Sequence, residues 1–135
     1  MHTSISGLHI LIVEDEPLLA WELELVFAGA GAVVVGPAST LEAGCKLAKQ
    51  NDLAAAVLDL RLGDEETWPL AALLHENGVP FIIHTGHGTP ASMAWTSVPV
   101  VRKPANPEEI VELISTLVLR QGNEVSPLLT AARHA

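Results

Sequence analysis

The amino-acid sequence predicts an α/β domain in which helices cover both faces of a doubly wound, five-stranded parallel sheet. Short apolar runs alternate along the chain with longer segments of helical period, which is the pattern of repeated βαβ units. Right-handed crossovers between such units leave few topologies. The chain has 135 residues, 49% of them hydrophobic, and this is enough to build one core.

The first unit begins after a short N-terminal extension, residues 1–7. A strand is predicted over Leu8–Val13. Pro17 then opens a helix, because the first helical turn tolerates a missing N–H group, and the helix ends at Gly29 or Gly31. Among the apolar residues that this helix carries are Leu18, Leu19, Trp21, Leu25 and Val26.

The second unit is shorter. Its strand is predicted over Ala32–Val35, where a Gly-Pro pair closes it. Ser39 or Thr40 caps the following helix, since a side-chain hydroxyl there accepts a hydrogen bond from the first turn. This helix runs to about Gln50.

The third and fourth units follow the same pattern. A strand over Ala54–Leu58 leads into a loop at 61–64 and a helix over Glu65–Glu76, which an Asn-Gly pair ends. The next strand is predicted over Pro80–His84. A short, weakly specified helix is expected over Thr89–Trp95.

The fifth unit completes the domain, which is predicted to span residues 8–120. Its strand covers Val98–Val101, and Pro107 opens a helix over Glu108–Arg120. The apolar residues expected on the inner face of this helix are Ile110, Leu113, Ile114, Leu117 and Val118. Residues 121–135 are expected to form a tail that is partly disordered or docked on the domain.

Charge and cysteine content exclude several classes of function. With 7 Lys and Arg against 16 Asp and Glu, the net charge is −9, so no basic surface is available for nucleic acid. Cys45 is the only cysteine, which excludes an internal disulfide and a thiolate zinc site. No signal peptide and no apolar run of about 20 residues is found. We therefore expect a cytoplasmic protein without a membrane partner.

Polar side chains follow four of the predicted strands at the point where each ends. They are Glu14 and Asp15, Asp59, Thr85 and Lys103. Because the carboxyl ends of parallel strands meet at one edge of a sheet, these side chains should lie together. Carboxylates suit Mg²⁺, and a carboxylate such as that of Asp59 can attack a phosphoryl group. The lysine and the threonine hydroxyl would then neutralise and bind the phosphoryl oxygens, so the pattern predicts a phosphoacceptor site.

Four segments in this order resemble the receiver domain of bacterial two-component response regulators. They are Leu11–Pro17, Val57–Leu60, Thr85-Gly86 and Arg102–Pro104, and the resemblance covers about residues 7–120. Each motif is weak alone, whereas four at family-like separations are specific. The resemblance implies a flavodoxin-like (βα)5 three-layer sandwich.

The resemblance also implies a function. Mg²⁺ would be held by Glu14, Asp15, Asp59 and the backbone carbonyl of Arg61, with phosphorylation on Asp59 from a sensor histidine kinase or a histidine phosphotransfer protein. Thr85 and Lys103 would bind the phosphoryl group. The protein would be a single-domain response regulator, monomeric or weakly dimeric, that signals by protein–protein contact or acts as a phosphate sink. It would not be an enzyme beyond Mg²⁺-dependent self-phosphorylation from a phosphodonor and slow autodephosphorylation.

Residues 80–88 resemble the Phe-Ala-Thr-Gly motif of an alphaproteobacterial subgroup of stand-alone receivers, often paired with HWE/HisKA2-type kinases. His84 replaces the alanine of that motif and His87 its usual aromatic residue. Two further positions depart from the wider family: Val100 stands where an aromatic switch residue is usual, and Ala105 where a phenylalanine is usual. We expect His84 to pack beside the sheet.

Other interpretations remain open. The missing aromatic residue at Val100 favours a receiver-like, protein-binding scaffold that does not switch. A phosphatase of the haloacid dehalogenase type also uses a nucleophilic Asp, but it expects a second acid where this chain has Arg61. Arg61 and His87 either tune the lifetime of the phosphoryl group or are ordinary loop residues. The tryptophans are core or partner-facing, and Trp95 is the best candidate for an exposed contact.

Overall fold

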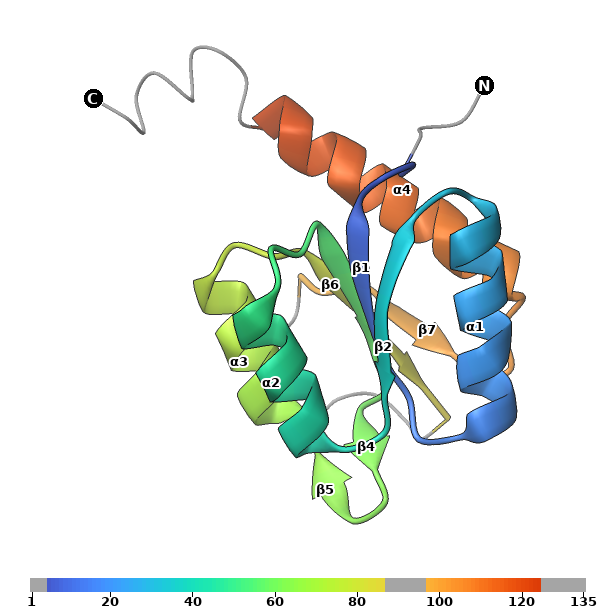
Figure 1. The fold of residues 1–135 in the computed structure, drawn as a ribbon, viewed down its shortest axis with the longest axis vertical. Coiled ribbons are helices and arrows are strands. Elements are labelled where there is room, and N and C mark those ends of the chain that lie inside the picture. Colours follow the sequence, from blue (N-terminus) through green and yellow to red (C-terminus); the bar gives the residue numbers. More distant parts are fainter. Residues whose placement is uncertain (1–4, 87–96, 125–135) are drawn as a thin grey trace.

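Five parallel strands form the centre of the protein, in the order β2-β1-β3-β6-β7 (Figure 1). The computed structural model describes residues 5–86 and 97–124. The strands of this sheet are β1 (His9–Val13), β2 (Val33–Ala38), β3 (Ala55–Leu58), β6 (Phe81–Thr85) and β7 (Val100–Arg102). Their order and parallel pairing confirm the predicted fold class.

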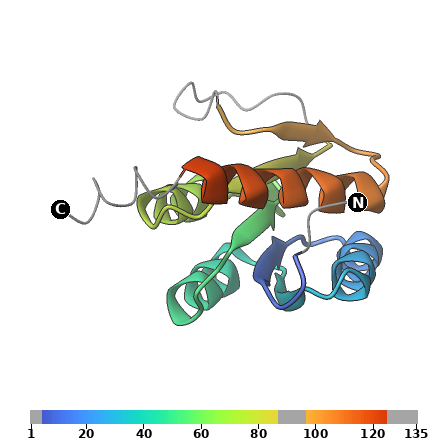
Figure 2. The same cartoon turned by 90° about the horizontal axis from the view of Figure 1, so that it is seen from above.

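Helices cover both faces of the sheet, as Figures 1 and 2 show. The described residues form four helices: α1 (Pro17–Gly29), α2 (Leu41–Gln50), α3 (Trp68–Glu76) and α4 (Pro107–Glu124). The pair α1 and α4 packs on one face, and the pair α2 and α3 packs on the other. The helix expected over Thr89–Trp95 lies outside the described residues, as do His87 and most of the expected tail.

The alternation of β1 divides the core in two. Leu11 and Val13 pack with the residues under α2 and α3, whereas Ile10 and Ile12 pack with those under α1 and α4. This follows from the period of two along a strand, which sends neighbouring side chains to opposite faces. Ile5, from the expected N-terminal extension, is 1% exposed and belongs to the α1–α4 core.

The boundary predicted for β2 is wrong, because the Gly-Pro pair does not end this strand. The strand continues to Ala38, with Gly36 at a φ of +97°. Its register with β1 shifts between Leu11 and Val13, where an irregularity absorbs the unusual backbone. The hydroxyl of Thr40 accepts from the Ala43 amide at 3.1 Å, which identifies Thr40 as the cap of α2.

The third helix begins at Trp68 and not at Glu65. Residues 65–66 form β5 (Glu65–Glu66), which pairs antiparallel with β4 (Arg61–Leu62) across a turn at Gly63, whose φ is +60°. At the other end of the chain, α4 continues past the expected end at Arg120 to Glu124. The last strand of the sheet, β7, begins at Val100 and ends at Arg102, one residue later than the predicted end at Val101. None of the helices in the described ranges has both the length and the apolar character needed to cross a bilayer.

We expect Gly36→Ala to lower the free energy of unfolding by at least about 2 kcal/mol. A Cβ atom at this position would lie 2.8 Å from the Ala38 nitrogen and 2.9 Å from the Ile12 oxygen, and both are backbone atoms that cannot rotate away. The positive φ adds backbone strain for any L-residue. Urea denaturation of the variant measures this loss.

Gly29→Ala is the matched control for this prediction. Gly29 ends α1, and nothing lies within 4 Å of a Cβ built there. Because alanine has the higher helix propensity, this change should leave stability unchanged or raise it by up to about 1 kcal/mol. Equal stability of the two alanine variants would contradict our account of the β2 irregularity.

Candidate functional site

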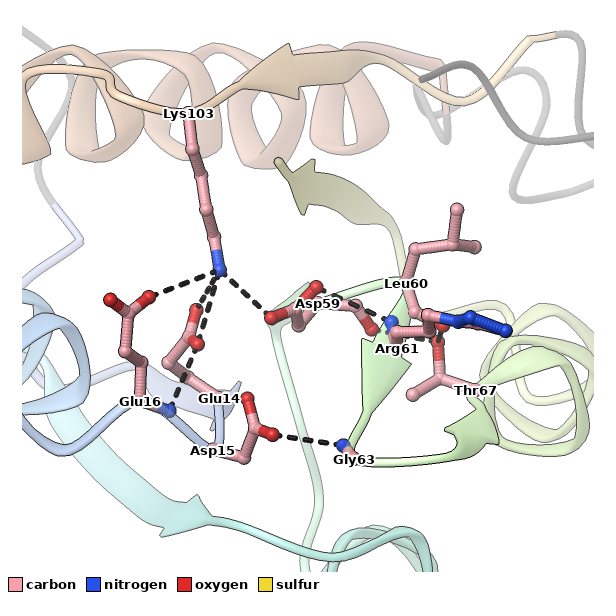
Figure 3. Close-up of polar contacts among 9 residues, drawn as sticks. All are labelled: Glu14, Asp15, Glu16, Asp59, Leu60, Arg61, Gly63, Thr67 and Lys103. Carbon is pink, nitrogen blue, oxygen red and sulfur yellow. Dashed lines mark hydrogen bonds and ion pairs between the residues drawn. The ribbon is translucent and has the colours of Figure 1, made fainter. Parts of the chain in front are cut away.

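Side chains from three strand ends meet at the carboxyl edge of the sheet (Figure 3). Glu14 and Asp15 follow β1, Asp59 follows β3, and Lys103 follows β7. β1 and β3 are paired up to Val13 and Leu58, so the residues after them leave the sheet at the same level. The structure thus brings together the carboxylates and the lysine predicted from the sequence.

Lys103 is the centre of the polar contacts. Its Nζ donates to Asp59 Oδ2 at 2.8 Å and lies 3.0 and 3.1 Å from the two carboxylate oxygens of Glu14. A third acid, Glu16, lies 3.9 Å away and is largely exposed. The side chains of Glu14 and Asp59 are only 1% and 6% exposed, so this lysine neutralises two carboxylates that water hardly reaches.

Burial and like charge determine the protonation of this cluster. Burial and the neighbouring charge of Asp59 raise the pKa of Glu14 to about 7, although Lys103 acts in the opposite direction. Burial lowers the pKa of Lys103, but its hydrogen bonds to Asp59 and Glu14 outweigh this effect, and the pKa is raised overall. The lysine therefore stays charged at neutral pH, whereas Glu14 has a pKa close to neutral pH and is partly protonated there.

Backbone amides of the loop after Asp59 bind two of the acids. The Arg61 amide donates to Asp59 Oδ1 at 3.3 Å, and the Gly63 amide donates to Asp15 Oδ2 at 2.9 Å. The β4–β5 hairpin holds this loop in place. Arg61 therefore lies beside the predicted phosphoacceptor, and ligation by its carbonyl oxygen stays a prediction.

Thr67 supports this loop from below, and the sequence analysis missed it. Its fully buried hydroxyl donates to the carbonyl of Asp59 at 2.8 Å and lies 3.2 Å from that of Leu60. Its amide also donates to Leu60 at 3.0 Å. A threonine just before a Trp-Pro pair is a signal for a helix start, but the helix had been predicted to begin at Glu65.

The three acids are suited to hold a divalent cation. One carboxylate oxygen from each of Glu14, Asp15 and Asp59 lies within 4.8 Å of the other two. Asp15 is exposed, and a cavity of about 400 Å³ extends from it to Asp59 and Lys103. A cation that prefers oxygen ligands and retains several waters, as Mg²⁺ does, fits such an open site.

Two strand residues next to the site are buried. Thr85 ends β6, is fully buried, and its carbonyl accepts from the Lys103 amide at 2.9 Å. His84 packs against the sheet, as expected, and neither of its ring nitrogens has a hydrogen-bond partner among the described residues. Burial and the charge of Lys103 lower the pKa of His84 to about 4, so the imidazole is neutral.

We expect Thr67→Val to lower the free energy of unfolding by about 1–2 kcal/mol, because the buried backbone carbonyl of Asp59, the predicted phosphoacceptor, loses its hydroxyl donor. Valine keeps the shape of threonine, so the loss isolates the hydrogen bond. Thr67→Ser keeps the hydroxyl and is the control. Denaturation curves in which the valine variant matches the wild type would contradict this role of Thr67.

We expect the metal-free protein to lose about 1–3 kcal/mol of stability as the pH rises from about 5 to 8. The folded state raises the pKa of Glu14 from 4.5 to about 7, so it holds a proton that the unfolded chain has released in this range. The free energy of unfolding is therefore greatest below pH 4.5, the pKa of Glu14 in the unfolded chain, and it falls as the pH rises through about 7, the pKa in the folded state. Denaturation at several pH values in a chelator measures the slope, and Glu14→Gln should remove it.

No protein-family model matches the chain. A curated relative, the phyllosphere-induced regulator PhyR of Methylorubrum extorquens, is 32% identical over 117 residues, which cover 83% of this chain and 44% of that protein. The chain thus spans less than half the length of that regulator. The relation nevertheless links the chain to a bacterial regulator.

Two solved structures resemble the protein over most of their length. SdrG from Sphingomonas melonis Fr1 is 30% identical, with a TM-score of 0.71 over 85% of this chain and 98% of that one. The CheY-like response regulator receiver domain protein from Methanospirillum hungatei JF-1 has a TM-score of 0.79 over 88% and 99% of the two chains, and at 24% identity it supports the fold. Together with the acidic site at the carboxyl edge of the sheet, these similarities show that the chain belongs to the family of response regulator receiver domains.

Proposed function

We propose that the protein is a response regulator that accepts a phosphoryl group on Asp59 from a sensor histidine kinase or a histidine phosphotransfer protein. The observation that carries this proposal is the 2.8 Å contact between Lys103 Nζ and Asp59 Oδ2, made beside a group of acids that suits a cation. It provides a nucleophilic carboxylate and a positive charge at the same place. Membership of the receiver family supports the same function.

In the proposed reaction, a carboxylate oxygen of Asp59 forms a bond to phosphorus while the bond to the donor nitrogen or oxygen breaks, and the donor keeps the electron pair. Glu14, Asp15, Asp59 and the carbonyl of Arg61 would hold Mg²⁺, which neutralises charge on the acids and the phosphoryl oxygens. Lys103 would transfer its hydrogen bond from the carboxylate to a phosphoryl oxygen. The hydroxyl of Thr85 would bind another.

The remaining parts of the proposal concern partners. The resemblance of residues 80–88 to the Phe-Ala-Thr-Gly motif supports a kinase of the HWE/HisKA2 type as the donor. The protein would work in the cytoplasm through a receiver domain over residues 8–120, and it would signal through a downstream protein or act as a phosphate sink. Phosphorylation adds roughly −1.5 to −2 charges, enough to bias the loops around the site.

A non-switching scaffold is the second candidate, and Val100 is the observation that favours it. This half-buried residue of β7 pairs with Ile83, and its aliphatic side chain cannot provide the aromatic rotamer change usual in receivers. A scaffold would bind its partner equally well before and after exposure to a phosphodonor.

Intact-mass measurement separates the two functions. The protein is incubated with Mg²⁺ and acetyl phosphate, or with a phosphorylated histidine phosphotransfer protein, and a parallel sample contains a chelator. We expect the mass of one added phosphoryl group in the presence of Mg²⁺ only. If the folded protein gains no mass from either donor, the phosphoacceptor function is refuted and the scaffold is favoured.

A further inference from the structure

His84 is a buried polar side chain whose hydrogen bonds the described part of the chain does not make. It is 1% exposed, and neither ring nitrogen has a partner among residues 5–86 and 97–124. The imidazole is neutral, because burial and the charge of Lys103 lower its pKa to about 4, so it has one N–H donor and one bare nitrogen acceptor. Buried polar groups in folded proteins are nearly all hydrogen-bonded. Two unmade hydrogen bonds on one side chain therefore indicate that a molecule outside the chain binds there, either water or a ligand.

A cavity of about 380 Å³ borders this imidazole. It lies between the start of α1, the end of β6 and the loop after β7, and we call it the His84 cavity. The alternation along β6 brings His84 to this side of the sheet, since Ile82 packs with the residues under α1 and α4 and Ile83 with those under α2 and α3. A water molecule occupies about 30 Å³ in the liquid, so the His84 cavity has room for a small organic molecule.

Apolar residues line the His84 cavity on two sides. Leu18 and Leu19 come from α1, and Pro104 and Ala105 come from the loop after β7. Leu18 and Pro104 are exposed whereas His84 is buried, so the cavity opens to solvent at one end and has the imidazole at its inner end. Sites for small molecules in proteins combine apolar walls with a few polar groups that fix the orientation of the ligand. The His84 cavity has this composition.

The charges around the His84 cavity favour a ligand without charge. Glu16 and Glu22 belong to its walls and would repel an anion. Lys103 also lines it, beside Glu16 (Figure 3), and lowers the pKa of His84 more than Asp59 raises it. A cation next to the imidazole would therefore be repelled as well. A neutral polar group is the partner that avoids both penalties.

We propose that the His84 cavity binds a small neutral molecule with an apolar body and one group that both donates and accepts hydrogen bonds, such as a carboxamide. Either nitrogen of a neutral imidazole can carry the proton, and a group of this kind matches the ring in both forms. The apolar body would contact Leu18, Leu19 and Ala105. The inference goes beyond the proposed phosphoacceptor function and does not depend on it.

The test compares four probes that share a benzene ring. Benzamide carries the neutral polar group, toluene lacks it, benzoate is an anion and benzylamine is a cation. Binding to the 135-residue protein is followed by amide chemical shifts in ¹H–¹⁵N spectra. We expect benzamide to bind at millimolar concentration, with shifts at His84 and Ala105. The other three should bind about tenfold more weakly or less, because a site that hydrogen-bonds a group discriminates against analogues without it.

Two variants place the probe in the His84 cavity. Ala105→Leu fills the cavity from the loop after β7 and should weaken benzamide binding about tenfold or more. Ala28→Leu is the matched control, since it adds the same side chain at an exposed position near the other end of α1 and should leave binding unchanged. His84→Phe keeps an aromatic ring but removes both nitrogens, so benzamide and toluene should bind this variant equally. Circular dichroism verifies the fold of each variant.

Three results would overturn the proposal. One is the failure of benzamide to bind the wild type at millimolar concentration, which would assign the His84 cavity to water alone. Another is binding of toluene, benzoate or benzylamine as tight as that of benzamide, which would mean that neither the imidazole nor the surrounding charges select the ligand. The third is unchanged benzamide binding to folded Ala105→Leu protein, which would place the probe elsewhere on the molecule.

Discussion

Asp59→Asn is expected to abolish phosphorylation completely under conditions in which the wild type gains one phosphoryl group from acetyl phosphate. The amide of asparagine is not a nucleophile towards phosphorus, so no residual reaction at this position is expected. Asparagine matches aspartate in size, and its one side-chain oxygen can still accept one of the two hydrogen bonds that the Asp59 carboxylate accepts from the Arg61 amide and from Lys103. Intact mass after incubation with Mg²⁺ and phosphodonor gives the result directly.

Asp64→Asn is the matched control for this experiment. Asp64 lies on the exposed turn of the β4–β5 hairpin, near the site but outside the contacts of Lys103. The Asp64→Asn variant should gain one phosphoryl group, as the wild type does. A phosphoryl group that persists in Asp59→Asn would place the reaction on another residue, such as the exposed Asp15 of the same acidic group, and would contradict the proposed mechanism.

The sequence was sufficient to predict the acids and the lysine because a parallel sheet converts chain position into spatial position. Four of the five apolar runs are followed by a polar residue of the site, and the register of β1 with β3 then brings Glu14 and Asp59 together. Glu16 and Thr67 could not be recognised in this way. Their contacts depend on the conformation of the loops after β1 and β3, which hydrophobic periodicity does not encode.

The errors in element boundaries have the same physical origin. Residues 65–66 follow a loop and precede a helical pattern, and only pairing with β4 makes them a strand. α4 continues past Arg120, where its end was expected, and through Gly122, because the helix cost of one glycine is modest. In α1, apolar residues occur on both faces, so periodicity alone cannot show that Phe27 is buried and Trp21 exposed.

Lys103→Met is expected to have the largest effect on stability, a loss of about 3 kcal/mol at pH 8 in the absence of divalent cation. The methionine would leave Glu14 and Asp59 as neighbouring carboxylates with 1% and 6% exposure and no positive charge between them. Removal of one partner from a buried ion pair costs more than the pair itself contributes. Urea denaturation followed by circular dichroism, in a chelator, measures the loss.

The same variant separates charge from packing. If repulsion between the acids causes the loss, then Mg²⁺ should restore most of the stability, because a cation among Glu14, Asp15 and Asp59 neutralises the same charges. Protonation should do likewise at pH 5, since the pKa of Glu14 is already raised to about 7 with the lysine present. Lys103→Arg keeps the charge and should lose much less. A loss in Lys103→Met that neither Mg²⁺ nor low pH reduces would mean that the aliphatic part of Lys103, and not its charge, stabilises this edge of the sheet.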